Sequence, residues 1–146
     1  MPILGFAAAL VLAAFGWFAA HPPEPDRADA GDIQLVALGE RVYGQQCAGC
    51  HGPKLEGEPD WQTRRPDGTL PAPPHDATGH TWHHADAQLF DITQRGVAAV
   101  VGGSYRSNMP AFGKVLSDRE IWAVLAFIKS RWPADIRAAQ ERTRRS

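Results

Sequence analysis

Apolar residues recur at helical spacing in three parts of the chain. From residue 35 to residue 43 they fall at intervals of three and four, which places them on one face of a helix. Residues 121–132 repeat this spacing directly after a capping-box sequence that starts at Ser117 and ends at Glu120. Residues 85–95 predict a shorter helix that stops at a glycine. The pattern therefore predicts an all-α domain.

Two further features indicate how these helices are connected. Gly39 lies in the apolar face of the first helix, where a glycine costs about 1 kcal/mol of helix stability but lets a second helix approach closely. The best candidate for that partner is the last helix, which Pro133 is expected to end. Residues 52–84, in contrast, are rich in proline and glycine and lack sustained periodicity. We expect an irregular loop there.

The amino-terminal residues form a separate apolar segment. Residues 3–20 carry no charged side chain, and as a helix of about 27 Å they are long enough to span the core of a bilayer. A cleaved signal peptide is the alternative, but a cut after Ala20 would place the bulky Phe18 beside the cleavage site, where small residues are required. We expect a transmembrane anchor over residues 1–20 and a proline-rich, acidic linker over residues 21–34.

Charge changes this picture only slightly. The chain has 15 Lys and Arg against 16 Asp and Glu, so its net charge of −1 gives no sign of a nucleic-acid partner. Residues 35–133 are neutral, whereas residues 134–146 carry four arginines and two acids. This basic tail is expected to be a short polar helix or disordered. Both cysteines of the chain lie in one motif, so no thiol is left for a structural disulfide.

The segment from Cys47 to His51 carries the candidate chemistry. Two thiols three residues apart are followed at once by an imidazole, a pattern in which the sulfurs attach to haem and the histidine binds its iron. A disulfide, a redox pair and half of a zinc site are the alternatives. The chain has no second Cys-x-x-Cys for zinc and no βαβ pattern typical of thioredoxin-like proteins. The motif predicts one covalently attached haem c, held by Cys47, Cys50 and His51.

With the Cys47–His51 motif between their first two predicted helices, residues 35–133 resemble a class I c-type cytochrome. The resemblance implies a cytochrome c-like haem domain whose first and last helices cross at a small residue and an aromatic. By this analogy four residues meet at the crossing: Gly39, Tyr43, Val124 and Phe127. The resemblance also implies that haem is attached outside the cytoplasm, which agrees with an anchored chain. The long loop could pack against the face of the haem in place of a protein core, which would explain how a loop of this length is tolerated.

A second iron ligand is expected from methionine, whose thioether stabilises ferrous iron. Met1 begins the apolar segment, so Met109 is the methionine that is left. Pro110 fixes its loop, and the preceding glycines permit a tight turn. The position of this loop before the last helix is similar to that of the ligand loop in class I cytochromes. A core methionine beneath a loop is the alternative.

Further haem contacts are expected from the long loop. The resemblance implies that a proline carbonyl accepts a hydrogen bond from the His51 ring and that the indole of Trp82 reaches a propionate. Three prolines are candidates for that carbonyl, with no choice among them: Pro71, Pro73 and Pro74. Three arginines suit the propionate charges: Arg64, Arg65 and Arg106.

A cluster of histidines offers a rival interpretation. Four imidazoles within ten residues are enough for a copper or zinc site or for a substitute haem ligand, and they belong to His75, His80, His83 and His84. Only His80 and His84 have helical spacing, and Gly79 disfavours a helix there. We favour a loop at the haem edge.

These observations predict a membrane-anchored monohaem cytochrome with His51 and Met109 as its metal ligands. We expect it to transfer single electrons between redox partners on the periplasmic side of the cell inner membrane, as a single-pass protein. A respiratory complex, an oxidase or a dehydrogenase is the expected partner. With both axial positions filled, no small-molecule substrate and no enzymatic reaction are expected. A haem sensor or catalytic haem without Met ligation, and a copper-handling module built on residues 75–84, are the alternatives.

Overall fold

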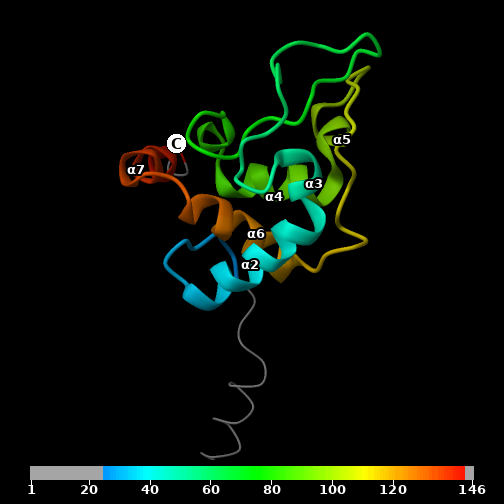
Figure 1. Cartoon of the computed structure of the whole chain (residues 1–146). Helices are drawn as coiled ribbons and strands as arrows, with labels where there is room; N and C mark the ends of the chain where they lie inside the picture. Colours follow the sequence, from blue (N-terminus) through cyan, green and yellow to red (C-terminus); the bar gives the residue numbers. More distant parts are fainter. Residues whose placement is uncertain (1–24, 144–146) are drawn as a thin grey trace, which may run out of the picture.

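Helices and loops make up the part of the chain that the computed structural model describes, residues 25–143 (Figure 1). The elements follow in the order α2 (Ile33–Gln46), α3 (Ala48–His51), the 3-10 turn η1 (Thr81–His83), α4 (Asp86–Arg95), α5 (Val97–Val101), α6 (Asp118–Ser130) and α7 (Ala134–Thr143). No β-strand occurs in these residues, and the predicted all-α fold is confirmed. The anchor predicted over residues 1–20 lies outside the described residues. Within them, none of the helices has the length and apolar character needed to cross a membrane.

The two principal helices start at caps that the sequence encodes. The carboxylate of Asp32 accepts hydrogen bonds of 3.0 Å from the backbone N–H groups of Gln34 and Leu35. At α6, the Ser117 hydroxyl accepts from the Glu120 backbone N–H while the Glu120 carboxylate accepts from that of Ser117. Such side chains satisfy amide groups that the first turn of a helix leaves unpaired. The predicted capping box is therefore confirmed.

Helices α2 and α6 make the most extensive contact between elements, and they cross at Gly39 (Figure 1). A Cβ atom built on Gly39 would overlap the carbonyl oxygen of Ala123 and lie 2.9 Å from Cβ of Phe127. The rings of Tyr43 and Phe127 lie 5.3 Å apart. The predicted crossing at Gly39 and Phe127 is confirmed. The α6 atoms nearest to the glycine belong to the Ala123 backbone, because the absent side chain makes room for the α6 backbone itself.

The remaining predicted elements are also present. Helix α4 matches the short helix expected over residues 85–95, and Gly96 ends it with a φ of 82°, a backbone conformation that glycine adopts without strain. The segment expected to be an irregular loop, residues 52–84, contains only the single turn η1. Its course is visible in Figure 1 as the long green connection between α3 and α4.

Helix α7 packs against the rest of the fold. Gln140 is fully buried, and its amide donates to the Asp86 carboxylate at 2.6 Å and to the His84 carbonyl at 3.2 Å. Lys129 of α6 lies 3.2 Å from the Asp86 carboxylate and 2.9 Å from that of Glu141. The side chains of Lys129 and Asp86 are each only 4% exposed. Buried polar groups thus join α7 to α4 and α6.

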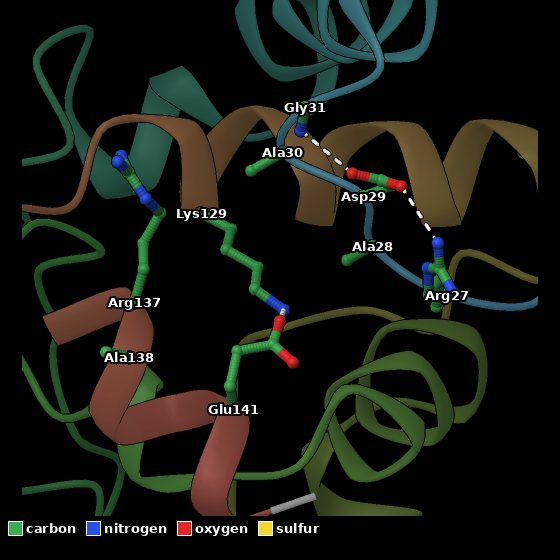
Figure 2. Close-up of a pocket in the computed structure, with 9 residues that line it drawn as sticks. All are labelled: Arg27, Ala28, Asp29, Ala30, Gly31, Lys129, Arg137, Ala138 and Glu141. Carbon is green, nitrogen blue, oxygen red and sulfur yellow. Dashed lines mark hydrogen bonds and ion pairs between the residues drawn. The ribbon is translucent and has the colours of Figure 1, made fainter. Parts of the chain in front are cut away.

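A cavity of about 450 Å³ lies beside this network, and Figure 2 shows the residues that line it. Its walls come from residues 27–31, α6 and α7, so it lies apart from the Cys47–His51 segment. In the wall, Arg27 pairs with Asp29 at 3.1 Å, and Lys129 points toward Glu141 (Figure 2). Arg27 and Lys129 are thus each paired with a carboxylate, while Arg137 donates to the Trp132 carbonyl at 2.8 Å.

Candidate haem-binding site

The Cys47–His51 segment occupies a single helical turn directly after α2. The Cys47 backbone N–H donates to the Tyr43 carbonyl at 2.9 Å and closes α2, and α3 then carries Cys50 and His51. The His51 backbone N–H donates to the Cys47 carbonyl, also at 2.9 Å. Residues three and four apart on a helix share a face. The turn therefore gathers both thiols and the imidazole on one side.

The two thiols are not joined by a disulfide. Burial, with a smaller effect of the neighbouring Cys50 thiol, raises the pKa of the Cys47 thiol to about 11. A redox-active Cys-x-x-Cys pair needs the opposite, a lowered pKa that yields thiolate at neutral pH. Cys47 is therefore poorly suited to thiol–disulfide exchange. Both thiols remain available for thioether bonds.

His51 is buried, with 8% of its surface exposed, and its ring makes one hydrogen bond. Its Nδ1 lies 2.8 Å from the carbonyl oxygen of Pro73, so among the three candidate prolines the structure selects Pro73. A carbonyl can only accept, so Nδ1 carries the hydrogen and Nε2 keeps a lone pair for a metal. Burial lowers the pKa of His51 and outweighs the opposing effect of the carbonyl. The neutral form that binds iron is favoured.

Tyr43 connects the helix crossing to this turn. Its hydroxyl donates to the Gly52 carbonyl at 2.8 Å and lies 3.3 Å from the His51 carbonyl. Burial raises the pKa of the Tyr43 hydroxyl, which keeps it protonated as a donor. The sequence interpretation assigned Tyr43 to packing alone. A tyrosine at a buried helical position was the signal that a polar partner is needed.

His75 contributes a contact that the sequence interpretation did not foresee. Its ring stacks on that of His51, with centroids 3.9 Å apart and planes inclined by 23°. Its Nδ1 lies 2.8 Å from the hydroxyl oxygen of Thr81. Burial, together with the nearby imidazoles of His51 and His80, holds the pKa of His75 well below its usual value. His75 thus belongs to the surroundings of His51.

The other histidines turn toward separate aromatic partners. His80 stacks on Trp61 with ring centroids 5.3 Å apart and meets His84 edge-on at 5.5 Å, while His83 stacks on Trp82 at 3.7 Å. Within residues 25–143, no three His, Cys, Asp or Glu side chains come together in a group able to hold a metal ion. The copper-handling alternative therefore finds no three-ligand site in the described residues.

Trp82 supplies an observation that tests whether haem suits this site. The side chain packs against the same core as Cys47 and Met109, yet its indole Nε1 is buried without a hydrogen-bond partner among the described residues. Buried donors in native structures are normally paired, and each exception calls for an explanation. An indole donor awaiting an acceptor fits the propionate contact expected of Trp82. The donor set of Cys47, Cys50 and His51 fits haem equally.

The loop that carries Met109 is held by hydrogen bonds from its backbone at two places along its length. Met109 is partly buried, and its backbone N–H donates to the Ser107 hydroxyl at 3.1 Å. Further along, the backbone N–H groups of Phe112 and Gly113 donate to the carbonyls of the last turn of α4, at 3.0 and 2.9 Å. The loop therefore holds Met109 against the core that Cys47 also borders. Iron binding by Met109 stays a prediction.

The three arginines expected near the propionates have different surroundings. Arg65 pairs with Glu58 at 2.7 Å. Arg64 donates to the Gly68 carbonyl at 2.6 Å and lies over the Tyr105 ring, 5.4 Å from its centroid. Arg64 and Arg106 line a second cavity, of about 420 Å³. A role toward propionates stays a prediction for all three.

This helical fold, with its thiol pair and anchored histidine, defines a class I c-type cytochrome domain. A comparison with models of protein families matches residues 34–128 to cytochrome c oxidase, cbb3-type, subunit III, and the chain belongs to this family. Covalently attached haem c is therefore its cofactor, and haem-based electron transfer is its activity. No curated protein and no solved structure matched the chain.

Proposed function

We propose that the protein is a membrane-anchored monohaem cytochrome that passes single electrons between redox proteins on the periplasmic side of the inner membrane. The observation that carries this proposal is the 2.8 Å contact between His51 Nδ1 and the Pro73 carbonyl. It leaves Nε2 as the metal-binding nitrogen of a buried, neutral imidazole. The family description names an oxidase subunit, which supports a respiratory oxidase complex as the partner.

Each residue of the site has a separate task in this proposal. When bound, haem c supplies a one-electron couple at its iron. Cys47 and Cys50 would hold the group through thioether bonds, and His51 and Met109 would bind its iron. Trp82 would donate its indole N–H to a propionate. If both His51 and Met109 bind the iron, no ligand position is left for a substrate, which favours an electron carrier over an enzyme.

Replacement of Met109 by alanine tests the ligand set. Methionine ligation favours ferrous iron, and axial ligands shift haem potentials over a range of about 0.8 V, so the variant should have a potential lower by on the order of 0.1 V or more. Ferric wild-type protein should show the weak long-wavelength charge-transfer band of methionine-ligated haem, and Met109→Ala should lack it. Redox titration followed by absorption measures both quantities on the same sample.

Val115→Ala is the matched control, because Val115 follows in the same connection to α6 and is 62% exposed. It should keep the wild-type band and potential. A wild-type protein without the band, whose ferrous haem binds carbon monoxide readily, would contradict Met109 ligation. That result would favour the sensor or catalytic alternative, because those functions need an open axial position.

The anchor has its own test. If residues 1–20 remain on the mature protein, its mass should be that of the full chain plus one haem, and detergent should be required to extract it. Exchange of these residues for a cleavable signal peptide should release the haem domain into the periplasmic fraction. A mature protein that lacks about the first twenty residues would contradict the anchor and leave the haem ligands unaffected.

A further inference from the structure

His51 is restrained by two groups from one short segment of the long loop. The carbonyl of Pro73 accepts from Nδ1 at 2.8 Å and fixes which ring nitrogen carries the hydrogen. One hydrogen bond restrains the tilt of a ring only weakly. The ring of His75, two residues further on, packs against a face of the His51 ring at a centroid distance of 3.9 Å. The tautomer and the plane of His51 are thus fixed by different neighbours.

His75 is itself anchored at three points. Its backbone N–H donates to the Leu55 carbonyl at 2.8 Å, and its carbonyl accepts from the indole N–H of Trp132 at 2.7 Å. Its ring nitrogen Nδ1 lies 2.8 Å from the Thr81 hydroxyl oxygen. These partners come from the loop, from the residues after α6 and from η1. A residue whose backbone is held by two segments and whose ring is held by a third presents a rigid surface to its neighbour.

The geometry points to His75 as a positioning residue that sets the plane of the His51 imidazole through the ring stack, with Thr81 fixing the stacked ring. The inference rests on the proposed function, in which His51 binds the iron. An aliphatic side chain at position 75 would fill the space but would offer neither a flat face nor a bond to Thr81. Residues that contact a metal-bound histidine without touching the metal orient the histidine and adjust the properties of the metal.

The test uses the ferric holo protein and its paramagnetic NMR spectrum. The order of the shifted haem-methyl resonances depends on the orientation of the axial imidazole plane. His75→Leu should change that order. His75→Phe keeps a flat ring but loses the bond to Thr81, so it should retain the wild-type order with shifts like those of Thr81→Val. Thr81→Val, which keeps the His75 ring but removes its hydrogen bond, should broaden the resonances or shift them less than His75→Leu. The potential of each variant is measured alongside.

His84→Ala is the matched control, since the His84 ring faces His80 and its Nδ1 faces Gln88 at 3.2 Å. It should leave the spectrum unchanged. A His75→Leu protein with lower stability but wild-type methyl order would overturn the inference and leave His75 with a packing role only. So would a His75→Phe variant that fails to restore the order. Because haem content and the methionine band are read from the same samples, a failure of His51/Met109 ligation would be seen separately.

Discussion

Replacement of Lys129 by methionine is expected to lower the free energy of unfolding by about 3–5 kcal/mol, because removal of one partner leaves a buried charge uncompensated. Lys129 and Asp86 are each only 4% exposed, and their charged atoms lie 3.2 Å apart. Methionine has nearly the same volume as lysine. The loss of unfolding free energy would therefore come from the removed charge and not from a cavity. Urea denaturation of the holo protein, followed by circular dichroism, measures it.

The same experiment contains its own comparison. Arg131 pairs with Glu40 at 2.9 Å, but the two side chains are 50% and 60% exposed, so Arg131→Met should cost less than about 1 kcal/mol. The double variant Lys129→Met, Asp86→Leu should recover a large part of the loss, because it removes both buried charges. Equal costs for Lys129→Met and Arg131→Met would show that the network at Asp86 contributes little.

Gly39→Ala is expected to destabilise the fold by about 3 kcal/mol, the upper range for an overpacked core. The added methyl group would overlap the Ala123 carbonyl oxygen, and a helix backbone cannot yield as a flexible side chain can. Haem retention should weaken as well, because the crossing also positions Tyr43, whose hydroxyl donates to the Gly52 carbonyl directly after the Cys47–His51 segment. Thermal unfolding of the ferric protein measures the change.

Gly44→Ala provides the matched control in the same helix. A Cβ atom at Gly44 meets nothing within 4 Å, so alanine there should stabilise α2 by about 0.5–1 kcal/mol. Opposite signs for the two substitutions are therefore expected. If Gly39→Ala stabilised the protein as Gly44→Ala does, the close approach of α2 and α6 would be wrong.

Local sequence signals predicted the parts of the fold that depend on neighbouring residues. The capping box at Ser117, the stop at Gly96 and the irregular course of residues 52–84 all depend on chemistry within a few positions. The crossing of α2 and α6 was predicted by analogy, which did not name Ala123 as the residue whose backbone meets Gly39. A glycine shows that a close approach occurs but not which atom of the partner fills the space.

Contacts between distant segments could not be predicted in the same way. Nothing in the spacing distinguished Pro73 from its neighbours as the partner of His51, because the loop path between them has no period. The spacing of the histidines suggested one cluster. In the structure His75 stacks on His51, His80 stacks on Trp61, and His83 stacks on Trp82. Aromatic partners more than ten residues away in sequence decided where His75 and His80 turned, whereas His83 stacks on the adjacent Trp82.

The burial of Gln140 has a consequence for where the independent folding unit ends. The family match stops at residue 128, but the environment of Asp86 is completed by Lys129 and by α7. A chain shortened at Pro133 would keep every candidate haem ligand but would expose the buried side chains of Asp86 and Lys129 to water. We therefore expect the smallest piece that folds cooperatively to be longer than the matched residues 34–128.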